Sequence, residues 1–165
     1  MEFNSSLVDH FKRLQVFDQW ATQRLIEDLE AIPPIDPTAL SRLSHILFSE
    51  DIWLARLLRE DLTRFTTAWP ELPPAECRGK LDELGKKWII YFSDLRDESF
   101  SEIIAYKNTR GVASWLSVGA VLTHVFDHSA YHRGQVTTAI KKAGGEPRAT
   151  GFYTYVFEER ETAEH

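Results

Sequence analysis

The chain has 165 residues, of which 43% are hydrophobic and 27% are charged, and its formal net charge at pH 7 is −6. This size and composition are typical of a soluble globular protein, so we expect residues 1–165 to form a single domain. The negative charge argues against a nucleic-acid-binding protein and against docking on an anionic membrane surface.

The N-terminal sequence and the single cysteine indicate a cytoplasmic protein without disulfides. The first residues, MEFNSSLVDHFKRL, lack the basic start and the apolar run of a signal peptide, and no apolar run is long enough to span a bilayer. Cys77 has no second cysteine with which to form a disulfide or a cysteine-based zinc site. We expect this lone cysteine to be unreactive.

Four long segments show apolar residues at the three- and four-residue spacing of amphipathic helices. The prolines of IPPIDP separate the first segment from the second, and Asp36 followed by Pro37 is a typical helix start. Gly144 and Gly145 form a typical C-terminal stop for the last segment. The expected helices span residues 5–31, 37–60, 75–97 and 112–143.

Two short segments complete the expected fold. Ile103 to Tyr106 is a β-like piece before the last long helix, either part of a small hairpin or an extended connection. The aromatic sequence FYTYVFEE predicts a short helix against the others, and the five tryptophans are expected mostly in the core. The fold class is therefore all-α, a four-helix bundle with a short β-like connection before its last long helix.

The last long helix carries three of the six histidines, His124, His128 and His132, at positions i, i+4 and i+8. On a helical wheel they fall in one sector, beside the apolar sector that faces the bundle. Histidines four residues apart can bind one ion, but His124 and His132 are ~12 Å apart along the helix axis. One ion with bonds of ~2.0–2.1 Å therefore takes one adjacent pair, and a third ligand has to come from another helix.

The remaining histidines differ in their surroundings. On the second helix, His45 points away from the main apolar arc and lies alongside Phe48 and Ile52, which suggests an enclosed position. His10 lies among charged residues and is expected at the surface, and His165 is the last residue of the chain. From spacing alone, a packed histidine-rich face and a metal site both remain open.

Three stretches of the chain resemble motifs of the DinB family of YfiT-like metalloenzymes. The family's histidine-bearing fourth helix, with its glycine turn and proline, is similar to LTHVFDHSAYHRGQVTTAIKKAGGEP. Its second-helix motif resembles LSHILFSEDIWLARL, and its opening helix resembles FDQWATQRLIEDL. Asp127 stands where the family often has Asn, and Gly151 stands where Asp is expected, but neither departure removes a candidate ligand.

The resemblance implies an up-down-down-up bundle that forms a homodimer and holds one divalent metal ion per chain. It assigns the ligands to His45, His128 and His132, and it gives His124 no ligand role. Zinc, nickel, iron and manganese are all candidate ions. Characterised relatives, some of them stress-induced, use the ion to activate a low-molecular-weight thiol for transfer to an electrophile.

Three neutral imidazoles leave a divalent ion with at least one open position, which is the arrangement of a catalytic site rather than a structural one. We therefore expect a metal-dependent thiol transferase that acts on a small-molecule substrate. Two alternatives stay open. One is a metal-dependent hydrolase at the same site. The other is a non-catalytic helical dimer that the metal stabilises.

Five polar residues near these motifs have two interpretations each. Tyr131 and Gln135 are both placed to orient a bound water or substrate. We favour instead a core position for Tyr131, and for Gln135 a hydrogen bond to a ligand imidazole. Glu50 and Asp51 lie within or beside the apolar arc of the second helix. A carboxylate there either acts as a general base near the metal or, as we favour, forms an ion pair with an arginine. Arg133 lies on the far side of the wheel from His124, and we expect it to form an ion pair at an interface or at the surface rather than to neighbour the metal.

Overall fold

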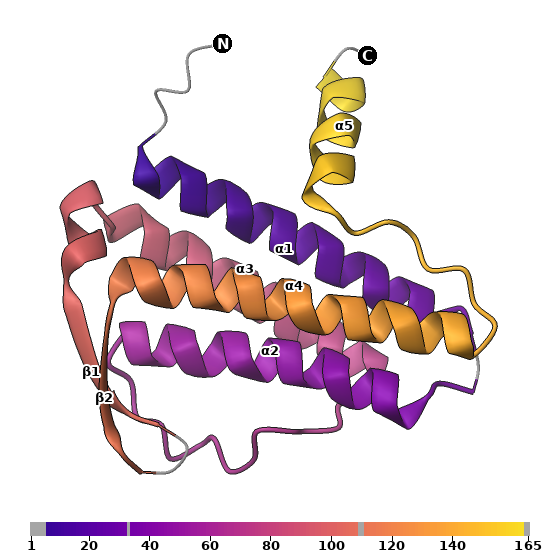
Figure 1. The fold of residues 1–165 in the computed structure, drawn as a ribbon, viewed down its shortest axis with the longest axis horizontal. Helices are drawn as coiled ribbons and strands as arrows, with labels where there is room; N and C mark the ends of the chain where they lie inside the picture. Colours follow the sequence, from indigo (N-terminus) through magenta and orange to yellow (C-terminus); the bar gives the residue numbers. More distant parts are fainter. Residues whose placement is uncertain (1–5, 33, 109–110, 164–165) are drawn as a thin grey trace.

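Four long helices form the body of the molecule (Figure 1). The computed structural model describes residues 6–32, 34–108 and 111–163. The long helices are α1 (Leu7–Glu30), α2 (Pro37–Leu57), α3 (Pro74–Asp94) and α4 (Val118–Lys142). Helices α2 and α3 run opposite to α1 and α4, so the predicted up-down-down-up bundle is confirmed.

Three of the long helices begin at a side-chain cap. Ser6 and Ser117 cap α1 and α4 by accepting a hydrogen bond from the backbone N–H three residues later. Asp36 caps α2 by accepting one from the N–H of Thr38, as its position before Pro37 predicts. At its other end α2 stops at Leu57 rather than at the expected residue 60. The cause is a positive φ of 58° at Arg59, which is incompatible with a continuing helix.

The connection before α4 is a β-hairpin, so α4 is shorter than predicted. Strand β1 (Ile103–Lys107) pairs antiparallel with β2 (Ala113–Ser117), and a 3₁₀ helix, η1 (Asp97–Ser101), precedes them. The expected helix start at residue 112 is therefore wrong, because residues 113–117 pair with β1 and the better cap, Ser117, lies after them. The hairpin also carries Tyr106 to Trp53 of α2, with 5.1 Å between ring centroids.

The expected short C-terminal helix is present as α5 (Phe152–Ala163). Its Tyr155 packs with Phe17 and Ala21 of α1 in a small cluster outside the main core. The turn before α5 is held to α1 by Arg148, whose Nε donates to Oδ1 of Asp28 over 2.7 Å.

The main core lies between the four long helices. Among its fully buried side chains are Leu25, Leu43, Leu54, Trp88 and Leu122. The expectation that the tryptophans are mostly core holds only in part, because Trp69 is 44% exposed and Trp115 is 67% exposed. Within the described residues, no helix combines the length and the apolar character needed to cross a bilayer.

A buried ion pair crosses the core between α4 and α1. Arg133 donates hydrogen bonds to Asp18 of α1 and to Oγ of Ser129, and its guanidinium lies 5.1 Å from the ring centroid of Phe17. The predicted ion pair of Arg133 is therefore confirmed, but its predicted position at the surface is wrong, because Arg133 is only 3% exposed. The helical wheel placed it away from the histidines correctly, but the opposite face of α4 packs against α1 rather than facing solvent.

Glu50 is another ionisable residue inside the core. Its Oε1 accepts a hydrogen bond from Nε1–H of Trp88 over 2.5 Å. Burial, followed by repulsion from the Asp18 carboxylate, raises the pKa of Glu50 to about 8 from its ordinary value of 4.5. At neutral pH the carboxyl group is therefore protonated in the folded protein.

This raised pKa predicts that Glu50 makes the folded protein less stable as the pH rises. The unfolded chain releases the Glu50 proton near pH 4.5, whereas the folded protein keeps it up to about pH 8. The contribution of Glu50 is fully present below pH 4.5 and is lost between these values, at up to ~1.4 kcal/mol per pH unit. Urea unfolding of wild type and Glu50→Gln over this range measures it. A free-energy difference between the two proteins that does not change with pH would contradict the prediction.

Candidate metal centre

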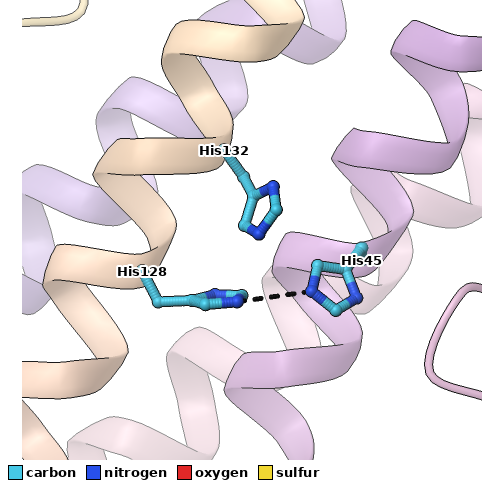
Figure 2. Close-up of side chains that lie close together, drawn as sticks. All are labelled: His45, His128 and His132. Atoms are coloured by element: carbon cyan, nitrogen blue, oxygen red, sulfur yellow. Dashed lines mark hydrogen bonds between the residues drawn. The ribbon is translucent and has the colours of Figure 1, made fainter.

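Helices α2 and α4 bring three histidines together. His45 of α2 and His128 and His132 of α4 point toward one another (Figure 2), and each offers a ring nitrogen within 4.8 Å of the others. We call these three residues the histidine triad. Because α2 and α4 are in extensive contact, one histidine on α2 meets an i, i+4 pair on α4. The structure therefore places the three residues that the sequence motifs singled out at one point.

The distances within the triad fit a shared ion. The Nε2 atoms of His45 and His128 are 3.3 Å apart. Two ligand atoms at ~2.0–2.1 Å from one tetrahedral ion are ~3.3–3.4 Å apart, so this separation matches without movement of the backbone. The ring of His132 is near both of the others, with centroid distances of 4.7 Å to His45 and 4.4 Å to His128.

Hydrogen bonds on the outer side of two rings leave their inner nitrogens as acceptors. The carbonyl oxygen of Ala68 only accepts, so Nδ1–H of His45 donates to it, over 2.5 Å. Nδ1–H of His132 likewise donates to Oε1 of Gln135 over 2.9 Å, which confirms the favoured interpretation of Gln135. A neutral ring that donates from Nδ1 presents a lone pair at Nε2. His45 and His132 therefore have the tautomer that metal ligation requires.

The surroundings of the triad keep all three rings neutral. Burial, and then repulsion from the neighbouring rings when charged, lowers the pKa of His128 to about 4. Burial also lowers the pKa of His45 and of His132. At neutral pH the triad is a set of uncharged nitrogen donors, and its chemistry and spacing fit a divalent ion.

Trp69 covers one side of the triad, which sequence analysis did not anticipate. Its ring stacks on that of His45, with 3.7 Å between centroids and 14° between planes. The connection between α2 and α3 runs along the bundle beneath α2 in Figure 1. It carries Ala68 and Trp69, which both contact His45. The sequence WPELPP, which begins at Trp69, indicates a connection between helices. An irregular connection follows no periodic pattern, so this sequence does not predict where the tryptophan side chain lies.

A cavity of about 270 Å³ adjoins the triad on the hairpin side. His124 lines it together with two members of the triad, and its ring lies edge-on to Trp53 at 5.1 Å. His124 does not belong to the group of possible ligands among the described residues. The cavity is lined by His45, Phe48, Ser49, Ile52, Trp53, Arg56, Ala68, Tyr106, Asn108, His124 and His128.

The two carboxylates of α2 lie apart from the triad. Asp51 forms ion pairs with Arg64, Lys80 and Lys87, with N···O distances of 2.6–3.7 Å. The favoured interpretation of Asp51 as an ion-pair residue is therefore confirmed. Glu50 is buried and hydrogen-bonded to a tryptophan instead of an arginine. Neither residue lines the cavity beside the triad, so the alternative of a general base is not supported there.

Four other residues complete the comparison with the sequence. Tyr131 is 65% exposed, so its predicted core position is wrong, although its ring centroid lies 5.0 Å from that of His132. His10 is exposed, as predicted. Cys77 is buried, and burial raises the pKa of its thiol, in agreement with an unreactive cysteine. His165 lies outside the described residues.

Comparison with known protein families gives a match over most of this chain. The model of the DinB family matches residues 18–163. This chain belongs to the DinB family. Protein DinB of Bacillus subtilis (strain 168) is a distant relative, 21% identical in an alignment 161 residues long that covers 88% of this chain and 92% of the relative. The DinB match includes all three histidines of the triad.

The geometry predicts that metal binding depends on His128 and not on His124, one turn earlier on the same helix. After dialysis against zinc, the wild type should retain about one ion per chain. His128→Gln should lose most of it, because only two imidazoles remain, and His124→Gln should retain it. Mass spectrometry of untagged protein measures the metal content, and circular dichroism checks that both variants fold. Equal zinc in His128→Gln and wild type would exclude the triad as the site.

Proposed function

We propose that this protein is a metal-dependent enzyme that binds one divalent ion through His45, His128 and His132. It activates a low-molecular-weight thiol for transfer to a small electrophilic molecule. The observation that carries the proposal is the convergence of three neutral imidazoles on one point at the wall of a cavity. Membership of the DinB family supports it, since the family motifs implied both the ligand set and this type of reaction.

Three protein ligands rather than four are the basis for a catalytic role. When bound, a divalent ion with three imidazole ligands keeps its positive charge and an open position, and it lowers the pKa of a thiol or a water there. The chain orients the ligands through Ala68 and Gln135 and shields His45 with Trp69. The apolar side chains of Phe48, Ile52 and Trp53 provide a wall that holds the body of a small substrate and excludes water.

The lining of the cavity favours a thiol over water as the nucleophile. None of the described residues that line it is an aspartate or a glutamate, so a water molecule there has no carboxylate to accept its proton. A free thiol has a pKa of about 8.5, far below that of bulk water, so a thiol needs much less help to ionise. The protein's own thiol is not a substitute, because Cys77 is buried away from the cavity.

The homodimer that the family resemblance implies is part of this proposal. The residues named as ligands, cover and cavity lining all belong to one chain. The proposed chemistry therefore does not depend on a contribution from the second copy.

The proposal predicts thiol-dependent consumption of an electrophile by the zinc-loaded protein. Monochlorobimane with glutathione, bacillithiol or mycothiol in turn provides the assay, followed by fluorescence. We expect conjugation with at least one thiol, a loss of at least about tenfold in His128→Gln, and an unchanged rate in His10→Gln, whose histidine is exposed.

Other outcomes of the same assay would contradict thiol transfer in different ways. Turnover of ester substrates without any thiol would favour the hydrolase. Protein that holds zinc, loses stability on chelation and conjugates none of the thiols would favour the structural metal site.

A further inference from the structure

The cavity beside the histidine triad also contains a guanidinium group without a counter-ion. Arg56 of α2 lines the cavity, and among the described residues no carboxylate forms an ion pair with it. Its Nε is buried and has no hydrogen-bond partner. Its one hydrogen bond there is a long one, 3.4 Å from Nη2 to the carbonyl oxygen of Lys107. Arg56 thus has donors that the fold leaves unused.

Two aromatic rings hold this guanidinium in place. Its central carbon lies 4.3 Å from the ring centroid of Trp53 on α2 and 4.7 Å from that of Tyr106 on β1. Stacking of this kind occupies the faces of the planar group and leaves its edge, with the N–H donors, for a ligand. The hairpin therefore fixes the orientation of Arg56 before any ligand binds.

Arg56 and His45 lie on the same face of α2. They are eleven residues apart, which is about three helical turns, and both line the same cavity. Side chains on a helix lean toward its N-terminus, so the long side chain of Arg56 extends from its own turn toward His45. A single small molecule in the cavity can meet the triad at one end and Arg56 at the other.

The charges around the cavity indicate an anionic ligand. Arg56 is the one residue with a permanent charge among the described residues that line it. A guanidinium with unpartnered N–H donors is destabilising, and a ligand that accepts hydrogen bonds from it removes that cost. Burial lowers the pKa of Arg56, as expected where a guanidinium loses water and gains no carboxylate.

We propose that Arg56 binds a carboxylate of the small molecule that reacts at the histidine triad, so that the protein selects substrates with a negative charge. A carboxylate is planar and accepts two parallel hydrogen bonds from the edge of a guanidinium. A single positive charge between apolar walls suits a singly charged carboxylate better than a phosphate, whose charge is near −2. The thiol and the electrophile are both sources of such a group. The inference rests on the proposed function only for the reacting end of the molecule.

Binding of benzoate and of its uncharged analogue benzamide to the full-length protein tests this inference. The readout is the Nε–Hε resonance of Arg56 in ¹⁵N-resolved NMR spectra, assigned by its loss in Arg56→Met. Benzoate should shift this resonance both in zinc-loaded and in metal-free protein, and benzamide should not. Arg56→Met should bind benzoate at least about tenfold more weakly than the wild type.

Arg42→Met is the matched control. Arg42 also lies on α2 and stacks on a tryptophan, Trp69, at 4.5 Å, but it does not line this cavity. Its substitution should leave benzoate binding unchanged. Equal affinity of wild type and Arg56→Met, or equal binding of benzoate and benzamide, would overturn the inference. If Arg56→Met does not fold, Arg56→Lys supplies the assignment, since it also lacks this resonance, and an Arg56 resonance in wild type that benzoate does not move would overturn the inference as well.

The metal-free measurement separates this inference from the proposed function. A protein that holds no zinc, or that conjugates no thiol, would refute the proposed function. If benzoate still binds at Arg56 in that protein, the assignment of Arg56 as a carboxylate site stands. In active protein, Arg56→Met should raise the KM for the one substrate that carries the carboxylate, thiol or electrophile. Unchanged KM values for both substrates would overturn the inference while thiol transfer stands.

Discussion

The buried ion pair between Arg133 and Asp18 determines how α4 is oriented in the bundle. An uncompensated charge in the core is very unfavourable, so α4 has to turn Arg133 toward α1. Successive residues on a helix are about 100° apart, so His132, the preceding residue, then faces α2 instead. His128 lies one turn earlier on the same face. The position of the triad therefore follows from a charge pair on the other side of the helix.

The site differs from the core in how its polar groups are used. Away from the cavity, Asp51 forms ion pairs with three partly exposed cations, and the buried Arg133 donates hydrogen bonds to Asp18 and Ser129. The unpartnered oxygens of the core belong to enclosed side chains that line no cavity beside the triad. Around the cavity, the fold satisfies the outer nitrogens of His45 and His132 and directs the inner ones at a common point. Arg56 follows the same rule, since aromatic rings hold it and its Nε stays unpaired. Beside the cavity, a ligand can bind to these oriented groups and so stabilise the protein.

Sequence alone predicted the parts of this account that depend on local spacing. The helical periodicity, the Asp36 cap and the limit of one adjacent histidine pair per ion all follow from the geometry of a single helix. The contribution of His45 needed the family resemblance, because spacing does not show which helices face each other. Residues whose position depends on non-local packing were missed or misplaced. Arg133 faces a helix instead of water, Trp69 comes from an irregular connection, and the start of α4 depends on strand pairing.

The central claim is that the triad holds an ion and leaves it accessible to a thiol. X-ray absorption spectroscopy of zinc-loaded protein, before and after addition of a thiol, tests it most directly. The account predicts three imidazole nitrogens at ~2.0–2.1 Å with one exchangeable light ligand, which a sulfur atom at ~2.3 Å replaces when thiol is added. A shell with fewer than three imidazoles, or one closed by a fourth protein ligand that no thiol displaces, would contradict it.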